Sequence, residues 1–191
     1  LDDSLRENIE LLDNRVKRME ELINGVLQYS RAGRAQEELT TVHTDQLIKE
    51  IIEELAPPEE VCIRMAHGMP VLTTSKVMLR QVLENLIGNA IQHREREKPS
   101  MITIDISDVG QYYEWSVIDN GPGIDPKYHE KVFEIFQKVH KKEQTESTGI
   151  GLTIVKKIVN RAGGSIYLVS QLGMGATFVF TWPKTWPQSL Q

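Results

Sequence analysis

Neutral polar side chains recur along one predicted helix of this chain. Gln81, Asn85, Asn89 and His93 are spaced four residues apart, which places them in one column on the helix that we expect over residues 76–93. The column holds no charged group, whereas a solvated helix face is usually rich in Lys and Glu. Amide oxygens can bind Mg²⁺, and amide N–H groups can bind phosphate oxygens, without a change of protonation. The helix alone leaves open a second interpretation, in which the amides cap neighbouring loops.

Three Gly-x-Gly pairs lie further along the chain: Gly121/Gly123, Gly149/Gly151 and Gly173/Gly175. The first pair follows Asp119 at the end of a predicted strand, where a carboxylate can accept a hydrogen bond from an exocyclic amine and glycine lets the backbone approach a flat ring. The second pair opens a predicted helix, whose N-terminal N–H groups and dipole favour an anion. The third pair suits a hairpin turn. No pair completes a P-loop or a dinucleotide-binding motif, but their order after the amide column is a specific signal.

The elements that must position these residues alternate between strands and helices. Strands are expected at 39–43, 61–65, 71–72, 101–107, 113–118, 166–170 and 177–182, and helices at 76–93, 126–136 and 149–162. A further helix carries Leu47 to Leu55, with Thr44 or Asp45 as its N-cap and Pro57 at its end. Because the strands arrive in hairpins with helices between them, we expect an α+β sandwich, a mixed sheet covered on one face by helices.

Residues 1–30 form a predicted amphipathic helix. Apolar side chains alternate at spacings of four and three: Leu5, Ile9, Leu12, Val16, Met19, Ile23 and Val26. Such a heptad seam needs a partner surface, and further leucines widen it as in a multi-helix bundle. We therefore interpret residues 1–33 as an oligomerisation element. A helix packed on its own domain is the alternative.

The composition fits a soluble globular protein. The chain has 191 residues, of which 40% are hydrophobic and 26% charged, and its net charge is −5; nucleic-acid binding would need a clustered basic excess instead. No run approaches the roughly 18 apolar residues that span a bilayer, so we expect no membrane contact. The single cysteine, Cys62, favours a reducing, cytoplasmic compartment. The chain begins at Leu1 without a signal-peptide pattern, and we expect a fragment of a longer protein.

Taken together, these motifs resemble the sensor histidine kinases, whose ATP-binding domain belongs to the GHKL group with gyrase B and MutL. Gln81–Ala90 resembles the N box, Asp119–Ile124 the G1 box, Lys131–Phe136 the F box, Thr148–Leu152 the G2 box, and Gly173–Phe178 the last glycine motif. Phe136–His140 resembles the phytochrome-like branch. The match covers nearly the whole chain. It implies a two-layer sandwich of the Bergerat type, preceded by a long dimerisation helix.

The resemblance implies a role for each matched residue. Asn89 would ligate Mg²⁺, Asn85 would assist at the phosphates of ATP, and Asp119 would accept from the adenine N6 amine. The other ATP-binding residues that it implies are Gln92, His93, Gly121, Gly123, Ile124, Lys131, Thr148, Gly149, Ile150, Gly151, Leu152 and Thr177.

The resemblance also implies a division of the chain and a set of partners. Residues 1–33 would be the second helix of a dimerisation and histidine-phosphotransfer hairpin, 34–185 the catalytic domain, and 186–191 a tail. A homodimer would transfer the γ-phosphate to a histidine and then to the aspartate of a response-regulator receiver domain. Two alternatives remain: a serine kinase of the anti-sigma type, and a non-catalytic interaction module.

The sequence departs from the family pattern at several positions. Gln92 stands where the N box usually has Lys, and His93 where it has an aromatic residue. Three lysines are candidates to replace that cation, unless they form a solvated loop: Lys138, Lys141 and Lys142. Ser147 stands where the G2 box usually begins with Gly. This departure puts the flexibility of a lid over 124–148 in question.

The acceptor histidine of the family is absent from the sequence. The family phosphorylates a His in an H box on the first bundle helix, and none of the five histidines here has that context: His43, His67, His93, His129 and His140. We therefore expect the acceptor to lie N-terminal to Leu1. A relative without an acceptor is the alternative.

Overall fold

A computed structural model describes residues 38–95, 97–135 and 149–186, together with positions 8, 9, 12, 13, 15, 16, 19, 20, 23 and 25–27 of the N-terminal segment. Its elements, in chain order, are β1 (Leu39–His43), α2 (Thr44–Leu55), β2 (Val61–Met65), β3 (Val71–Ser75), α3 (Lys76–Gln92), β4 (Ser100–Val109), β5 (Tyr112–Asp119), η1 (Pro126–Tyr128), η2 (Lys131–Phe133), α4 (Gly151–Arg161), β6 (Ile166–Ser170) and β7 (Ala176–Pro183).

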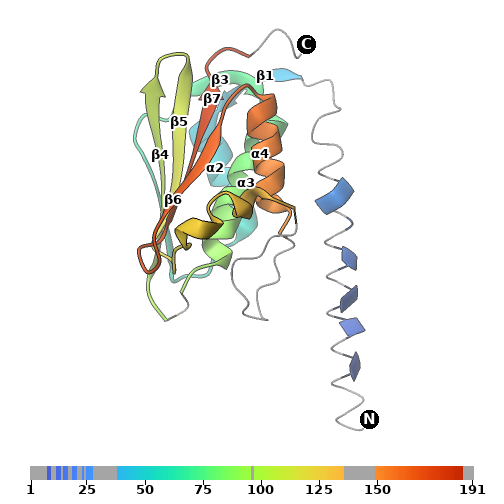
Figure 1. The fold of residues 1–191 in the computed structure, drawn as a ribbon. Helices are drawn as coiled ribbons and strands as arrows, with labels where there is room; N and C mark the ends of the chain where they lie inside the picture. The colour runs from blue at the N-terminus through green and yellow to red at the C-terminus, as the bar shows by residue number, and fades with distance from the viewer. Residues whose placement is uncertain are drawn as a thin grey trace.

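A five-stranded mixed sheet forms one layer of the fold (Figure 1), in the order β2-β4-β5-β7-β6. The pair β2–β4 is parallel and the other pairs are antiparallel. Helices α2, α3 and α4 lie on one face of this sheet, and β1 pairs with β3 in a small second sheet. The α+β sandwich predicted from the sequence is therefore confirmed.

The core lies between the sheet and the helices. Alternate residues of adjacent strands point inward in register, so that Ile104 of β4, Val117 of β5 and Phe178 of β7 lie side by side. Leu83, Leu86 and Ile87 of α3 are fully buried against the core. Burying each such side chain contributes about 1.5–3 kcal/mol. This apolar face fixes the rotation of α3 and therefore determines which side chains it presents to solvent.

The starts of two helices differ from the sequence prediction. Neither Thr44 nor Asp45 caps α2, because the helix already begins at Thr44, and the cap position, His43, makes no side-chain hydrogen bond. The hydroxyl of Thr44 instead donates to the Pro70 carbonyl at 2.6 Å. α4 begins at Gly151 rather than at residue 149. The reason is that Gly149 has a φ of +69°, which is outside the helical range.

The helix predicted over 126–136 is wrong as a single element. The described part forms two 3-10 turns, η1 and η2. Asp125 accepts from the Lys127 N–H at 3.0 Å and starts the first turn. The second turn ends because Glu134 is extended, with ψ at 152°. Ser75, in contrast, caps α3 as predicted by accepting from the Met78 N–H at 3.3 Å.

The N-terminal segment is helical at each of its described positions, in agreement with the predicted helix. Its apolar seam is exposed there: Ile9, Leu12, Val16, Met19, Ile23 and Val26. Gly25, which is not part of the seam, is buried and lies against Ile150. The homodimer stays a prediction. Within the described part of the chain, no helix combines the length and apolar character needed to cross a bilayer.

Candidate functional site

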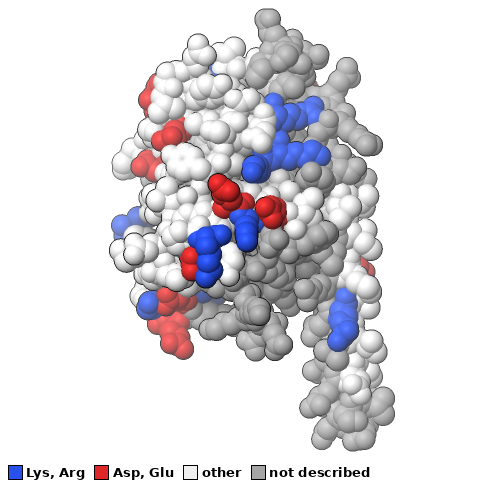
Figure 2. Space-filling view, viewed as in Figure 1, with Lys and Arg blue, Asp and Glu red and all other residues white. Residues whose placement is uncertain are grey.

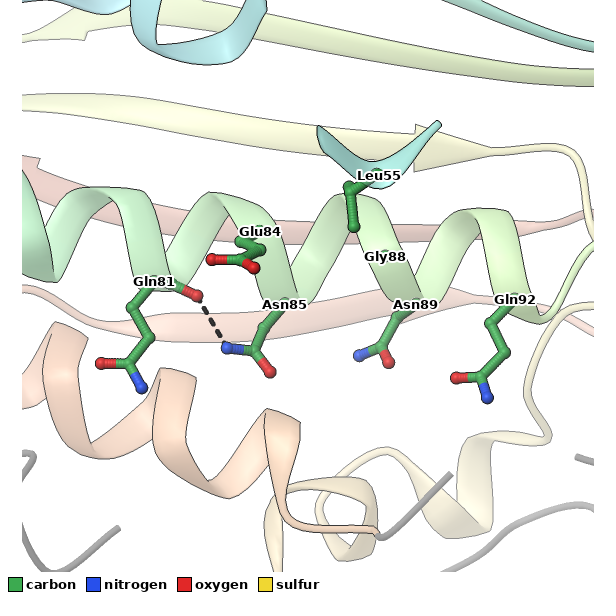
Figure 3. Close-up of a pocket in the computed structure, with 7 residues that line it drawn as sticks. All are labelled: Leu55, Gln81, Glu84, Asn85, Gly88, Asn89 and Gln92. Atoms are coloured by element: carbon green, nitrogen blue, oxygen red, sulfur yellow. Dashed lines mark hydrogen bonds between the residues drawn. The ribbon is translucent and has the colours of Figure 1, made fainter. Parts of the chain in front are cut away.

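The amide column of α3 lines a pocket of about 370 Å³. Gln81, Asn85, Asn89 and Gln92 project from the same side of the helix (Figure 3), and Leu55, Glu84 and Gly88 complete the lining. The amide of Asn85 is held in place because its Nδ2 donates to the Gln81 carbonyl at 2.7 Å. The amides of the column predicted from the sequence thus line a pocket, and Asn85 also lies beside the start of α4.

The last member of the column differs from the prediction. His93 is the C-terminal cap residue of α3 and does not line the pocket, whereas Gln92 does. The His93 carbonyl instead faces the loop after β5, since a Cβ added at Gly121 would lie 3.3 Å from it. The backbone of His93 therefore lies beside the loop that follows Asp119.

Asp119 ends β5, and its half-buried carboxylate is oriented by the backbone. Its Oδ1 accepts from the Gly121 N–H at 2.8 Å and from the Ala176 N–H at 3.2 Å. Burial raises the pKa of Asp119, and the two N–H donors oppose that rise. Both of these hydrogen bonds use Oδ1, so the second carboxylate oxygen has a fixed direction in which to accept from a ligand.

Three glycines of the first and third pairs, Gly121, Gly123 and Gly175, pack tightly in the loops at Asp119. A Cβ at Gly175 would collide with the Asp119 carbonyl, and one at Gly123 would collide with the Gln171 carbonyl. Ser170 links the two loops, because its Oγ accepts from the Ile124 N–H at 2.8 Å and donates to the Gly175 carbonyl at 2.6 Å. Gly175 is therefore part of the site, whereas a Cβ at Gly173 would meet no atom within 4 Å, as expected of a hairpin turn.

The second glycine pair brings the start of α4 to the amide column. A Cβ at Gly151 would lie 2.6 Å from Oδ1 of Asn85, so a larger residue there would require the Asn85 side chain to shift. Ile150, between the two glycines, is 2% exposed and lies against Gly25 of the N-terminal segment. The free N–H groups of the first turn of α4 are therefore close to Asn85.

Some residues predicted for the site lie elsewhere. Thr177 alternates with the buried Ala176 and Phe178 in β7, so its side chain faces the side of the sheet opposite the helices. The side chain of Leu152 packs against the core, and Lys131 is exposed at the start of η2. Thr148 lies outside the described residues, as do Ser147 and the three lysines of the 138–142 stretch.

Two contributors were missed by the sequence prediction. Ala176 acts through its backbone N–H and Ser170 through its hydroxyl. Ser170 carries a weak signal, because a small hydroxyl residue just before a glycine pair can bridge two loops. Ala176 carries no signal of its own, since its role depends on the pairing of Asp119 with Ala176 across β5 and β7.

The metal chemistry that the pocket could support is limited to amide and carboxylate oxygens. The described residues contain no group of three or more His, Cys, Asp or Glu that could hold a metal ion. Asn89 lines the pocket with a neutral amide. Such a ligand fits Mg²⁺, which prefers oxygen and is usually shared between one or two protein groups and the phosphates of a substrate.

Comparison with known proteins assigns the domain. A family model described as histidine kinase-, DNA gyrase B-, and HSP90-like ATPase matches residues 74–185. Cyanobacterial phytochrome A of Nostoc sp. is 35% identical over 185 residues, which are 96% of this chain and 24% of the phytochrome. The adaptive-response sensory kinase SasA of Crocosphaera subtropica is 31% identical, over 89% of this chain and 46% of the kinase. The chain thus spans less than half the length of these relatives.

Solved structures agree with the fold. The full-length kinase ShkA in complex with AMPPNP has a TM-score of 0.76 and is 28% identical, covering 97% of this chain and 40% of ShkA. The histidine kinase ThkA in complex with the response regulator TrrA has a TM-score of 0.70. At 24% identity, over 97% of this chain and 53% of ThkA, this second likeness establishes the fold alone.

Proposed function

This chain belongs to the histidine kinase-, DNA gyrase B-, and HSP90-like ATPase family, and from that premise we propose that it is the ATP-binding catalytic portion of a sensor histidine kinase. The observation that supports this most is that two glycine segments meet α3 while a third meets Asp119 at the end of β5. Gly121 meets the end of α3 at His93, Gly151 meets its middle at Asn85, and Gly175 meets Asp119. Helix α3 therefore lies between the Asp119 carboxylate, which is held by backbone N–H groups, and the start of α4, where backbone N–H groups can bind an anion.

Asp119 would recognise the adenine ring. Its Oδ1 is already held by two backbone N–H groups, which leaves the other oxygen to accept from the exocyclic N6 amine. An ionised carboxylate offers only acceptor oxygens, so the ring would be recognised by a charge-assisted hydrogen bond. Gly121 and Gly123 allow the loop to lie close to the ring plane, and the backbone of Ile124 is fixed by Ser170.

The phosphates would lie along the amide column toward the start of α4. Asn85 and Asn89 offer N–H donors to phosphate oxygens, and Gly149, Ile150 and Gly151 place backbone N–H groups and the helix dipole at the same end. Mg²⁺ would be held by the Asn89 oxygen and would supply neutralisation of phosphate charge. The contribution of the chain's own residues is to position the γ-phosphate and to balance its charge.

The acceptor would be a histidine N-terminal to this chain. We assign residues 1–33 to the second helix of a dimerisation bundle, 34–185 to the catalytic domain and 186–191 to a tail, in a cytoplasmic homodimer. The exposed seam of the N-terminal segment supports the dimer. A response-regulator receiver domain would take the phosphate in turn. The complex of ThkA with its response regulator supports this last step by analogy.

Calorimetric titration of Asp119→Asn with ATP and Mg²⁺ tests the site. Losing a hydrogen bond to a charged acceptor costs about 1.5–3 kcal/mol, so we expect affinity to fall at least about tenfold. Asp105→Asn on β4 is the matched control, because Asp105 is an exposed aspartate of the same sheet that pairs with Ser116 of β5, away from Asp119. Equal affinity of wild type and Asp119→Asn would remove Asp119 from the site.

Phosphate transfer distinguishes the alternatives. Supplied with a separate helix fragment that carries an H-box histidine, the chain should form an acid-labile, alkali-stable phosphohistidine on that fragment. Labelling of a serine in a partner protein would favour the anti-sigma-type kinase instead. Tight ATP binding without transfer to any acceptor would favour a non-catalytic module.

A further inference from the structure

The hydroxyl of Ser170 lies in the middle of a short chain of hydrogen bonds between two loops. Its Oγ accepts from the Ile124 N–H at 2.8 Å and donates to the Gly175 carbonyl at 2.6 Å. The Ile124 backbone has a second anchor, because Nε2 of His129 donates to the Ile124 carbonyl at 3.1 Å. Loss of the Ser170 hydroxyl should therefore affect Gly175 more than Ile124.

The Gly175 carbonyl belongs to the same peptide group as the Ala176 N–H. This group is planar and trans, so its C=O and its N–H point in opposite directions. Ser170 binds the C=O, and Oδ1 of Asp119 accepts from the N–H at 3.2 Å. A hydrogen bond that fixes the carbonyl therefore also fixes the direction of the N–H. A donor on the carbonyl polarises the peptide group as well, which strengthens the N–H as a donor.

This peptide group needs such a restraint because it follows a glycine. Gly175 has a φ of +77°, and glycine allows the adjoining peptide groups to rotate widely. The hairpin over residues 166–183 contains no charged residue, whereas Figure 2 shows basic side chains gathered over α4. The hairpin can therefore act on the Asp119 carboxylate only through neutral hydrogen bonds and packing.

We propose that Ser170 is a positioning residue for base recognition. Its hydroxyl orients the Gly175–Ala176 peptide group, which holds Oδ1 of Asp119, so that the other carboxylate oxygen points at the exocyclic amine of a 6-aminopurine. Ser170 thus contributes to selectivity for adenine over a purine without that amine, and it acts through the backbone rather than by contact with the base. This inference rests on the proposed ATP site.

Calorimetry in Mg²⁺ can compare ATP with purine riboside 5′-triphosphate, in which hydrogen replaces the 6-amino group. For the wild-type chain we expect ATP to bind at least about tenfold more tightly, because the analogue has no amine to donate to Asp119. Ser170→Ala should reduce this ratio by at least about threefold by weakening ATP. Its affinity for the analogue should stay within about twofold of wild type, which would also show that the variant is folded. Ser170→Thr keeps a hydroxyl and should restore the ratio.

Ser165→Ala is the matched control. Ser165 is exposed just before β6, and its Oγ lies 3.3 Å from Oγ1 of Thr181. Thr181 is five residues beyond Ala176 along β7, or about 17 Å at the rise of a strand. The substitution therefore removes a hydroxyl from the same strand pair far from Asp119, and we expect the wild-type ratio of affinities.

Amide hydrogen exchange followed by NMR tests the mechanism without a nucleotide. In Ser170→Ala the Ala176 N–H should exchange at least about fivefold faster than in wild type, because it loses its fixed direction toward Asp119. The Gly121 N–H is the other donor to Oδ1 of Asp119, and its exchange should change by less than about twofold. This contrast would separate a local loss of orientation from unfolding.

The results that would contradict the proposal can be told apart. Equal losses of affinity for both nucleotides in Ser170→Ala would overturn the positioning role and leave the ATP site intact, because a general change in the pocket would explain them. An unchanged ratio, or unchanged exchange of the Ala176 N–H, would overturn it as well. Equal wild-type affinity for the two nucleotides would overturn base recognition by Asp119 and with it the role of Ser170. Absence of ATP binding by the wild-type chain would refute the proposed function itself.

Discussion

Replacing Gly151 by alanine should weaken ATP binding without destabilising the fold. The added Cβ would lie 2.6 Å from Oδ1 of Asn85, and to reach a contact of about 3.4 Å the amide must retreat by about 0.8 Å. That retreat disturbs the 2.7 Å hydrogen bond from Asn85 to the Gln81 carbonyl, which contributes about 0.5–1.5 kcal/mol. It also removes a donor from the phosphates. We expect a loss of affinity of about tenfold or more, measured by calorimetry in Mg²⁺.

The stability of this variant should move little, because two effects oppose each other. Gly151 is the first residue of α4, and alanine is favoured over glycine in a helix by up to about 1 kcal/mol, which offsets the disturbed amide. A midpoint of thermal unfolding within a few degrees of wild type, about 2–4 °C for a chain of this size, would show that the loss of affinity does not come from unfolding.

A double-mutant cycle separates the proposed cause from a general effect on α4. If the methyl group acts by displacing Asn85, then Gly151→Ala should cost no further affinity once Asn85→Ala has removed that amide. The coupling energy would then equal the whole effect of the single substitution. Additive losses in the double variant would refute this reasoning, and so would unchanged affinity in Gly151→Ala alone.

Two further predictions concern protonation and assembly. Because burial raises the pKa of Asp119, ATP affinity should begin to fall on acidification at a pH above the ordinary aspartate pKa of about 3.9. Calorimetric titrations at several pH values would measure this. A fall in affinity only near the ordinary pKa would contradict the prediction, because it would indicate a fully solvated carboxylate. The same shift means that the protonated carboxyl favours the folded state and that this stability is lost as pH rises through the raised pKa, so Asp119→Asn should unfold at neutral pH no more easily than wild type. Ile23→Asp should lower the sedimenting mass by placing an unpaired charge in the heptad seam; an unchanged mass would contradict the proposed bundle.

The features that were predicted correctly from the sequence depend on local periodicity. The amide column and the Ser75 cap each depend on residues within one or two helical turns. The strand that ends at Asp119 depends on a few alternations of apolar and polar residues. Gln92 lines the pocket and His93 does not, and this difference from the predicted column has a geometric reason. Each step of four residues overshoots a full turn by about 40°, so His93 has rotated about 120° from Gln81, whereas Gln92 returns to within about 20° of it.

The features that the sequence did not reveal depend on contacts between distant segments. Ala176 donates to Asp119 only because β5 and β7 pair in the register that sets these two residues opposite each other. The same register turns Thr177 to the far side of the sheet, although its motif suggested a place in the site. The single helix predicted over 126–136 failed because short-range propensity could not show that the chain becomes extended at Glu134.

The glycines of the site are better explained by packing than by flexibility. A side chain at Gly151 would meet Asn85, and one at Gly175 or Gly123 would collide with the backbone of the neighbouring loop. Gly123 and Gly175 therefore let two loops approach more closely than any other residue would allow. The buried apolar face of α3 fixes the position of this helix, and the segments that pack against α3 are fixed with it. The Asp119 carboxylate and the start of α4 are therefore held at a set separation before any ligand binds. Such preorganisation lowers the entropy that ligand binding must overcome, and it explains why a single methyl group at Gly151, 2.6 Å from one amide oxygen, is expected to reduce affinity while leaving the fold intact.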